Sequence, residues 1–208
     1  MSAPDGKPPP SDLRQAKQAL RKTILSARDA LPIEQRELLS ERITARLLEL
    51  PAFQTARSVL AYLSFGGEFQ TAAFVDTLRS RGVEIALPRV NRAARRLDIF
   101  RILDPQADTV AGPWGIREPD PARCSPARLD GIEAILVPGV AFTPICERLG
   151  YGGGFYDRLR QHWPRESHFI AAAFDVQIVD SLPISADDRL VDAVITELCF
   201  YPKDAGGG

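Results

Sequence analysis

The chain has 208 residues, and its 26 Lys and Arg against 27 Asp and Glu give a formal net charge of −1 at pH 7. This balance gives no reason to expect a nucleic-acid or membrane partner, because both favour a basic excess. Hydrophobic residues make up 45% of the chain, which is ordinary for a globular protein. No apolar run approaches the roughly 20 residues of a membrane span. The length predicts one domain with a sizeable core.

The two ends and the cysteines indicate where the protein works. Residues 1–11 are rich in Pro, Ser and Gly and lack the apolar segment of a signal peptide. We expect 1–11 and 205–208 to be disordered tails around a domain at 12–204. The three cysteines are widely spaced and odd in number, which is typical of free thiols in a reducing compartment: Cys124, Cys146 and Cys199. The sequence therefore predicts a cytoplasmic protein.

Two helices are expected before the first strand. Apolar residues at helical spacing predict a cationic amphipathic helix over 12–30, capped by Ser11 or Asp12. Lys17, Arg21 and Arg28 lie near one another on one side of this helix, and a solvated face is the simplest interpretation of them. A second helix is predicted over 33–50, closed by Pro51.

Beyond these helices, short apolar runs alternate with helical segments, which implies an α/β domain with a largely parallel sheet. Pro88 is expected to stop the second strand, and residues 104–131, with five prolines, to be mostly loop. The predicted strands are 58–65, 83–87, 97–103, 132–137, 169–174 and 193–196, and the predicted helices are 71–81 and 155–163.

A glycine-rich loop separates strand 132–137 from helix 155–163. It has Gly150, Gly152, Gly153 and Gly154 within five positions, so it cannot be regular structure. Such a loop before a helix directs backbone N–H groups and the helix dipole at one point, which suits phosphate.

The spacing of these glycines matches neither common phosphate loop. Phe155 stands where a dinucleotide fingerprint needs its third glycine, and no Gly-Lys-Ser/Thr ending of a Walker loop is present. A turn whose glycines only ease packing is the alternative. The flanking Arg148, Asp157 and Arg158 favour a metal–nucleotide site, because such sites use cations and carboxylates.

Other patterns point to chemistry less directly. There is no GxSxG, and two histidines with scattered cysteines give no zinc spacing. A run of five arginines predicts a solvated hairpin, with a polyanionic ligand tail as the alternative: Arg89, Arg92, Arg95, Arg96 and Arg101. Three aspartates precede the last predicted strand: Asp187, Asp188 and Asp192. They are predicted to be surface turn residues, with the alternative that one of them supplies an oxygen ligand to Mg²⁺.

Five segments form one pattern in chain order. They are Lys17-Gln-Ala-Leu20-Arg21, Gly67-Glu68, Trp114-Gly-Ile-Arg-Glu-Pro119, Val137–Phe142 followed by Arg148–Arg158, and Asp188-Arg-Leu-Val-Asp192-Ala-Val-Ile-Thr-Glu197. Together they resemble the 5-formyltetrahydrofolate cyclo-ligase (methenyltetrahydrofolate synthetase) family over nearly the whole chain.

The resemblance implies a single α/β domain like that of NagB, RpiA and CoA-transferases, with a mostly parallel sheet, helices on both faces, and a monomeric state. It also implies an activity that depends on ATP and Mg²⁺. That activity is the cyclisation of 5-formyltetrahydrofolate to 5,10-methenyltetrahydrofolate, through an N5-iminium phosphate, with release of ADP and phosphate.

The same resemblance assigns roles to residues. Lys17, Arg21 and Arg148 would be the catalytic contacts to phosphate, and Asp157 and Asp188 would hold Mg²⁺. ATP would also contact Leu149, Gly150, Tyr151, Gly152, Gly153, Gly154, Phe155 and Tyr156. The folate would contact Leu63, Glu68, Tyr151, Gly152, Gly153, Gly154, Phe155 and Tyr156.

The chain departs from the family pattern in one loop and at one aromatic position. Thr143 and Cys146 stand where the family usually has Asp and Gly, and Phe155 where Tyr is common. Two alternatives stay open. The first is a folate- or nucleotide-binding homologue with impaired catalysis, and the second is an isomerase or transferase of a phosphorylated metabolite on a similar sheet.

Overall fold

The computed structural model describes residues 10–112, 115–163, 166–185 and 188–203. Its centre is an eight-stranded sheet in the order β12-β11-β10-β7-β1-β2-β3-β6. The strands from β11 to β2 are all parallel, and β12, β3 and β6 add antiparallel edges. The strands are β1 (Ser58–Leu60), β2 (Glu84–Asn91), β3 (Arg96–Ile102), β6 (Ser125–Pro126), β7 (Ala134–Val137), β10 (His168–Ala172), β11 (Ala193–Ile195) and β12 (Phe200–Pro202).

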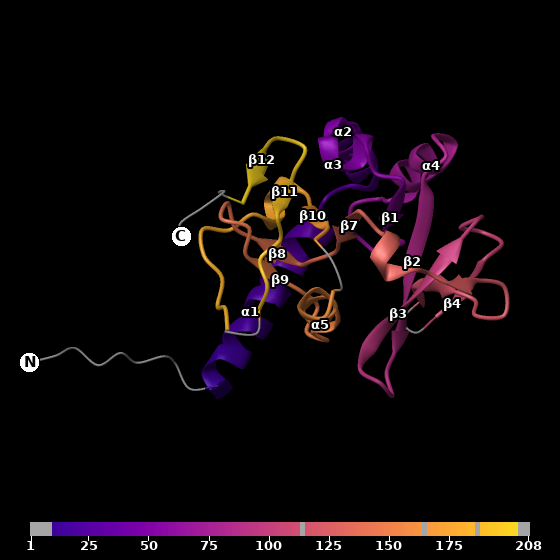
Figure 1. Cartoon of the computed structure of the whole chain (residues 1–208). Coiled ribbons are helices and arrows are strands. Elements are labelled where there is room, and N and C mark those ends of the chain that lie inside the picture. Colours follow the sequence, from indigo (N-terminus) through magenta and orange to yellow (C-terminus); the bar gives the residue numbers. More distant parts are fainter. Residues whose placement is uncertain (1–9, 113–114, 164–165, 186–187, 204–208) are drawn as a thin grey trace, which may run out of the picture.

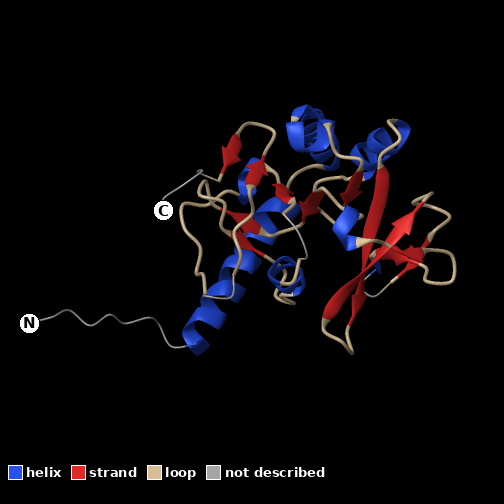
Figure 2. Cartoon of the chain, viewed as in Figure 1, coloured by secondary structure: helices blue, strands red, loops and turns tan. Residues whose placement is uncertain are grey.

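Helices cover both faces of this sheet, as expected (Figures 1 and 2). Successive residues of a strand point to opposite faces, so each buried strand supplies two core layers. In β1, Val59 packs in the layer with α2 (Ile33–Glu49), α3 (Pro51–Gln54) and α4 (Ala72–Ser80). Leu60 packs in the other layer, with α5 (Phe155–Gln161).

The first helix, α1 (Pro10–Asp29), joins a third, smaller cluster. Its Ile24 packs with Val140 and Leu149 at the hairpin of β8 (Ala141–Phe142) and β9 (Arg148–Leu149). Figure 1 shows α1 and α5 on the side of the sheet opposite α2 and α4. The N-terminal helix is therefore brought beside the segment that leads into the glycine loop.

Several boundaries differ from expectation. Helix α1 starts at Pro10, so Ser11 and Asp12 lie in its first turn and do not cap it. Residues 1–9 and 204–208 lie outside the described residues. Pro51 does not simply close α2, because it is the first residue of α3, where its missing N–H costs nothing. Strand β1 is only three residues long, and 61–65 continue as irregular chain.

The prediction that Pro88 stops its strand is wrong. Strand β2 runs through Pro88 to Asn91 and pairs with β3 throughout. The carbonyl of Ala86 faces β1 and accepts from Ala61 N, so the nitrogen of Pro88, two residues on, faces the same side. By then β1 has ended, and no ladder hydrogen bond is lost.

The proline-rich stretch 104–131 is mostly loop, as expected, with short elements in it: β4 (Thr109–Ala111), β5 (Arg117–Pro119), β6 and the 3-10 turn Leu129–Gly131. Trp114 lies outside the described residues. The three cysteines are free thiols, as predicted. Within the described ranges, no helix has the length and apolar character needed to cross a membrane.

Candidate functional site

A pocket of about 1090 Å³ opens at the carboxyl ends of the parallel strands. It is lined from Tyr62 and Leu63 after β1 and from Pro138 after β7. These two strands are neighbours whose chains leave to opposite sides of the sheet, and ligands of α/β sheets bind at such a switch point. Every residue that the sequence assigned to the site lines this pocket.

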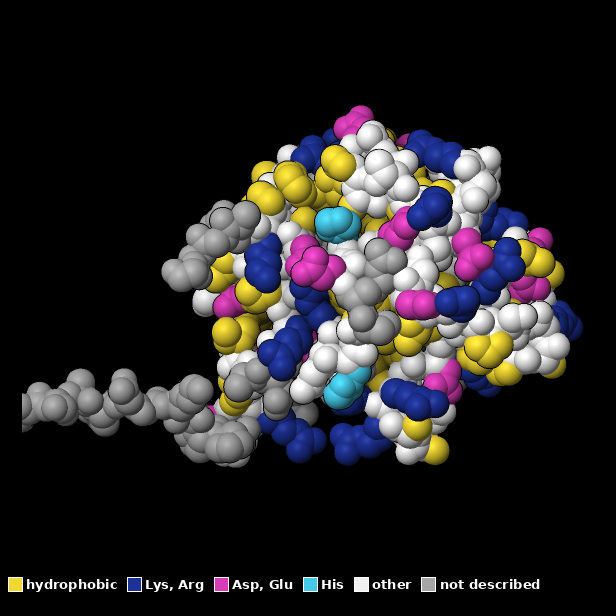
Figure 3. Space-filling model, in the orientation of Figure 1, with side chains coloured by type: hydrophobic (Ala, Val, Ile, Leu, Met, Phe, Trp, Pro, Cys, Tyr) yellow, Lys and Arg dark blue, Asp and Glu magenta, His cyan; other side chains and the backbone are white. Residues whose placement is uncertain are grey.

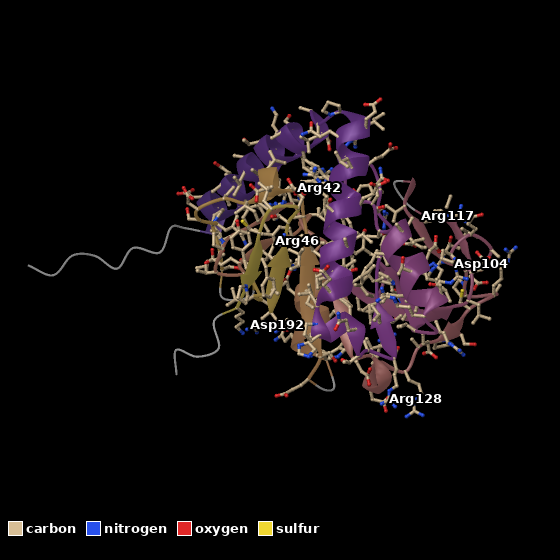
Figure 4. All side chains as sticks on the ribbon, turned by 90° about the horizontal axis from the view of Figure 1, so that it is seen from above. Arg42, Arg46, Asp104, Arg117, Arg128 and Asp192 are labelled. Atoms are coloured by element: carbon tan, nitrogen blue, oxygen red, sulfur yellow. The ribbon has the colours of Figure 1, made fainter. Side chains whose placement is uncertain are left out.

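A second cavity, of about 750 Å³, lies where β7 and β10 begin. It is lined by Glu133, Arg160 and Asp192 among others, and it holds none of the expected site residues. Asp192 accepts hydrogen bonds from Nη1 and Nη2 of Arg160 and from Phe169 N. Its carboxylate therefore has a structural role. Figure 4 shows Asp192 well apart from Arg117, which lines the larger pocket. Asp187 lies outside the described residues.

Two cations of α1 enter the pocket. Lys17 and Arg21 are four residues apart and so share a helix face. Lys17 Nζ lies 2.5 Å from Asp188 Oδ2, and Arg21 Nε donates to the carbonyl of Gly150 at 2.8 Å. Burial opposes ionisation of Asp188, but hydrogen bonds from Lys17 and Ser185 and the Lys17 charge outweigh it and lower the pKa of Asp188.

Arg148 forms the floor of the same end of the pocket. Its side chain is buried, and its Nη2 lies 2.6 Å from Asp157 Oδ1 in the first turn of α5. Its Nη1 donates to the carbonyl of Pro138 at 3.1 Å. Asp157 Oδ1 also accepts from Arg189 N at 3.5 Å, so the segment that carries Asp188 lies beside Asp157.

The two expected metal ligands therefore reach one region, each paired with a cation. The described part of the chain has no group of three or more His, Cys, Asp or Glu side chains that could hold a metal. Asp157 and Asp188 fit an ion that takes one or two carboxylates and receives its other ligands from substrate phosphates and water. Mg²⁺ is bound in this way in many phosphoryl-transfer sites.

The glycine loop lies between the two ends of the pocket. Gly152 (φ 101°) and Gly154 (φ 63°) adopt the left-handed conformation, which L side chains disfavour. The carbonyl of Gly150 is held by Arg21, and the carbonyl of Gly153 by Arg158 Nη2 at 2.7 Å. Two arginines from helices on either side of the loop, Arg21 of α1 and Arg158 of α5, thus hold its backbone in place.

The opposite end of the pocket holds a buried acid. Glu68 is 5% exposed; its Oε2 accepts from Phe65 N and its Oε1 from the Tyr151 hydroxyl. Burial raises the pKa of Glu68, against the effect of these hydrogen bonds and of the Arg28 charge. Nearby, no described residue gives the buried Tyr156 hydroxyl a hydrogen-bond partner. A ligand here would meet the Glu68 carboxylate, with the unused Tyr156 hydroxyl buried close by.

Sequence reasoning did not assign a role to two residues at this site. Glu118 lines the pocket, is buried and accepts from Val90 N at 3.2 Å; the Gly-Ile-Arg-Glu-Pro motif was a signal for it. Arg28 is buried and donates to the Tyr151 hydroxyl. Its position near Lys17 and Arg21 on one helix was visible in the sequence, but its burial was not.

The arginine run forms the β2–β3 hairpin and is largely paired locally. Arg89 donates to the carbonyl of Pro119, Arg96 pairs with Asp98, and Arg101 pairs with Glu84. This supports the solvated-hairpin prediction. On the face in Figure 3, Lys and Arg side chains gather along the lower edge, where Figure 1 places α1, α5 and the tip of this hairpin.

The loop that differs from the family pattern, which contains Thr143 and Cys146, is the tight turn of the β8–β9 hairpin. Thr143 N donates to the carbonyl of Glu147, and Cys146 N donates to the carbonyl of Thr143. Cys146 has φ 66°, the conformation for which glycine is favoured at this point of a three-residue hairpin loop. Both side chains are buried and neither lines the pocket.

Together, fold and pocket define an α/β protein whose site joins a cation-rich, phosphate-type end to a buried carboxylate. Comparison with known proteins agrees with this class. The model of the 5-formyltetrahydrofolate cyclo-ligase family matches residues 13–197. The chain is 31% identical over 196 residues to a probable 5-formyltetrahydrofolate cyclo-ligase of Caenorhabditis elegans, covering 90% of this chain and 95% of that one.

It is also 31% identical over 174 residues to the 5-formyltetrahydrofolate cyclo-ligase of Escherichia coli, covering 83% of this chain and 96% of the relative. The solved structure of Aquifex aeolicus 5,10-methenyltetrahydrofolate synthetase aligns with a TM-score of 0.79 at 31% identity, covering 92% and 95%. The corresponding Mycoplasma pneumoniae structure, 23% identical with a TM-score of 0.71 and covering 87% and 98%, supports the fold. The chain belongs to the 5-formyltetrahydrofolate cyclo-ligase family, a family of ligases.

Proposed function

We propose that this protein catalyses the ATP- and Mg²⁺-dependent cyclisation of 5-formyltetrahydrofolate to 5,10-methenyltetrahydrofolate, with release of ADP and phosphate. One observation carries the proposal: a single cavity collects every residue that the family resemblance assigns to ATP, metal and folate. The proposal extends to a monomer that works in the cytoplasm on small molecules.

The reaction needs two different ends of one pocket. A formyl amide oxygen is a poor leaving group, and its phosphorylation by ATP makes it a good one. N10 of the folate then attacks the formyl carbon, the carbon–oxygen bond breaks, and phosphate leaves with that oxygen. Both steps depend on close placement of the reacting atoms. Folate and ATP must therefore bind side by side, as the cavity allows.

Lys17, Arg21 and Arg148 supply positive charge at the phosphate end. Phosphoryl transfer spreads negative charge over the transferred group and the leaving oxygen, and fixed cations stabilise that charge. Lys17 is paired with Asp188 and Arg148 with Asp157, and these ion pairs hold both cations at this end of the pocket. Bound Mg²⁺ would supply further charge neutralisation, with Asp157 and Asp188 as its protein ligands.

Glu68 serves the folate end. The edge of a pterin ring offers N–H donors, and a carboxylate that accepts two of them fixes the ring. The carboxylate of Glu68 has acceptor capacity beyond its contacts with Phe65 N and Tyr151. The unpartnered Tyr156 hydroxyl and the side chain of Leu63 complete this end.

The test is the near-ultraviolet absorbance of 5,10-methenyltetrahydrofolate formed from 5-formyltetrahydrofolate, with and without Mg²⁺ and ATP. Lys17→Gln should reduce turnover at least tenfold, while Lys22→Gln should leave it unchanged. Lys22 is an exposed residue of the same helix, outside the pocket, which makes it a matched control.

The two alternatives give distinct results. A binding homologue would bind Mg-ATP and 5-formyltetrahydrofolate in calorimetry without forming product. An isomerase or transferase of a phosphorylated metabolite would act without ATP. It would also give the Lys17–Asp188 pair no role in the reaction.

A further inference from the structure

One buried cation near the pocket has no part in the mechanism above. Arg28, on the last turn of α1, is 3% exposed. Burying a guanidinium is costly unless its N–H groups and charge are matched. The hydrogen-bond and charge partners of Arg28 therefore indicate which groups it positions.

Arg28 is the first member of a chain of contacts that reaches Glu68. Its Nη1 donates to the Tyr151 hydroxyl at 2.9 Å, and that hydroxyl donates to Glu68 Oε1 at 2.5 Å. Its Nε and Nη2 contact Asp29 Oδ1 at 3.0 and 2.9 Å. The chain links three segments that are distant in sequence: α1, the glycine loop and the loop after β1.

The backbone beside Glu68 also rests on this cluster. A Cβ placed on Gly67 would collide with Asp29 Oδ1 and would lie 3.2 Å from Arg28 Nε. A side chain at position 67 would therefore force Asp29, and to a lesser degree Arg28, to shift. The segment 66–68 thus packs directly against Arg28 and Asp29.

Charge gives a second reason for Arg28 to be there. Glu68 is faced by the hydroxyls of Tyr62, Tyr151 and Tyr156, and Arg28 is the cation whose charge favours its ionised form. A carboxylate must be ionised to accept hydrogen bonds at both oxygens. Losing the cation would make a neutral, poorly accepting Glu68 easier to form.

We propose that Arg28 is a positioning residue for folate binding: through the Tyr151 hydroxyl it holds the glycine loop against Glu68 and balances the charge of that buried acid. This inference rests on the proposed function, because Glu68 is taken to bind the pterin. Arg28 itself does not line the pocket, so it touches neither folate nor ATP.

The experiment measures the dissociation constants of 5-formyltetrahydrofolate and of Mg-ATP by calorimetry, and KM for each substrate, in five proteins besides the wild type. These are Arg28→Gln, Arg28→Lys, Tyr151→Phe, the Arg28→Gln/Tyr151→Phe double variant and Arg42→Gln. Arg42 is an exposed residue of α2, on the other face of the sheet from α5 (Figure 4), and serves as the control.

We expect Arg28→Gln to weaken folate binding about tenfold, to change Mg-ATP binding by less than about threefold, and to be partly rescued by Lys. If Arg28 acts through Tyr151, the double variant should bind folate about as weakly as Tyr151→Phe alone. Because Arg28→Lys and Tyr151→Phe keep most of the packing, they report on the inference even if Arg28→Gln folds poorly.

Three results would overturn it. These are unchanged folate affinity in Arg28→Gln, equal losses for folate and Mg-ATP in every Arg28 variant, or full additivity in the double variant. A wild-type protein that neither binds 5-formyltetrahydrofolate nor forms product would instead overturn the proposed function, and this inference with it.

Discussion

Lys17 and Asp188 are 171 positions apart in the chain and form an ion pair of 2.5 Å at the phosphate end of the pocket. Each group therefore has a charged partner, and under the proposed function bound Mg-ATP would replace this pair with a Lys17–phosphate and an Asp188–metal contact. Each charge would keep an opposite charge beside it. Substrate binding would therefore not leave a half-buried charge without a partner, which is energetically costly.

Asp188→Asn should raise the Mg²⁺ concentration needed for half-maximal activity by about tenfold or more. The amide removes the negative charge of the proposed metal ligand, and it also frees Lys17 from its ion pair, so the affinity for nucleotide should fall less than the affinity for metal. Titration of activity with Mg²⁺ at fixed ATP measures this. Asp130→Asn, which alters an exposed pair with Arg128 (labelled in Figure 4), should change nothing. An unaltered Mg²⁺ requirement in Asp188→Asn would exclude the metal role.

Glu68→Gln should gain stability relative to the wild type as pH rises from about 4 to neutral, and it should weaken folate binding ten- to hundredfold. The pKa of Glu68 is raised by burial, so the folded state loses stability as pH rises through that pKa. Glutamine mimics the protonated acid and avoids this loss. The advantage should shrink as pH falls to about 4, where Glu68 is protonated in both folded and unfolded chains. Chemical denaturation of both proteins across this pH range checks the sign, and a stability difference that does not shift toward the variant as pH rises would contradict it.

Tyr156→Phe should increase the free energy of unfolding by about 1–3 kcal/mol, because no described residue bonds its buried hydroxyl. Each kcal/mol corresponds to a rise in Tm of about 2–4 °C in a protein of this size. The same substitution should weaken folate or ATP binding severalfold, since a ligand would lose the hydroxyl. A drop in Tm would show that the hydroxyl has a partner in solution.

Thr143→Asp should destabilise the protein by roughly 1–3 kcal/mol near neutral pH. Thr143 Oγ1 lies 3.3 Å from Glu147 Oε2, so a second carboxylate there would face a like charge. Thr143→Asn, which has no charge, should be tolerated better, and the difference between the two variants should vanish as pH falls and the new acid is protonated. Mg-ATP affinity should stay within a few-fold, because Thr143 does not line the pocket.

Cys146→Gly should be at least as stable as Cys146→Ala, the reverse of the usual order. Both lose the contact of Sγ with the Tyr201 carbonyl, but alanine keeps the left-handed strain at φ 66°, which costs about 1–2 kcal/mol. Thermal unfolding of the two variants side by side measures the order. A clearly more stable alanine variant would mean that packing of the Cβ outweighs the strain.

The layers of the fold could be predicted from local patterns. Short apolar runs such as Ala134–Val137 have no polar face to expose, which predicts central strands. The helices α2 and α4 follow from local start and stop signals: Pro32 and Pro51 for α2, and Thr71 and Gly82 for α4. Predictions at the boundaries were weaker, because they depend on neighbours: Pro88 is tolerated in β2 only because β1 ends before reaching it.

The family resemblance also predicted residues that line one pocket, because the Lys-x-x-Leu-Arg, Gly-Glu and glycine-loop motifs are local and distinctive. What only the tertiary structure decided is how they pair: Lys17 with Asp188, Arg148 with Asp157, and Arg28 through Tyr151 with Glu68. Charge–charge and hydrogen-bond energies depend on distance and burial. The order of residues along a chain fixes neither until the sheet has brought α1, the glycine loop and the strand ends together.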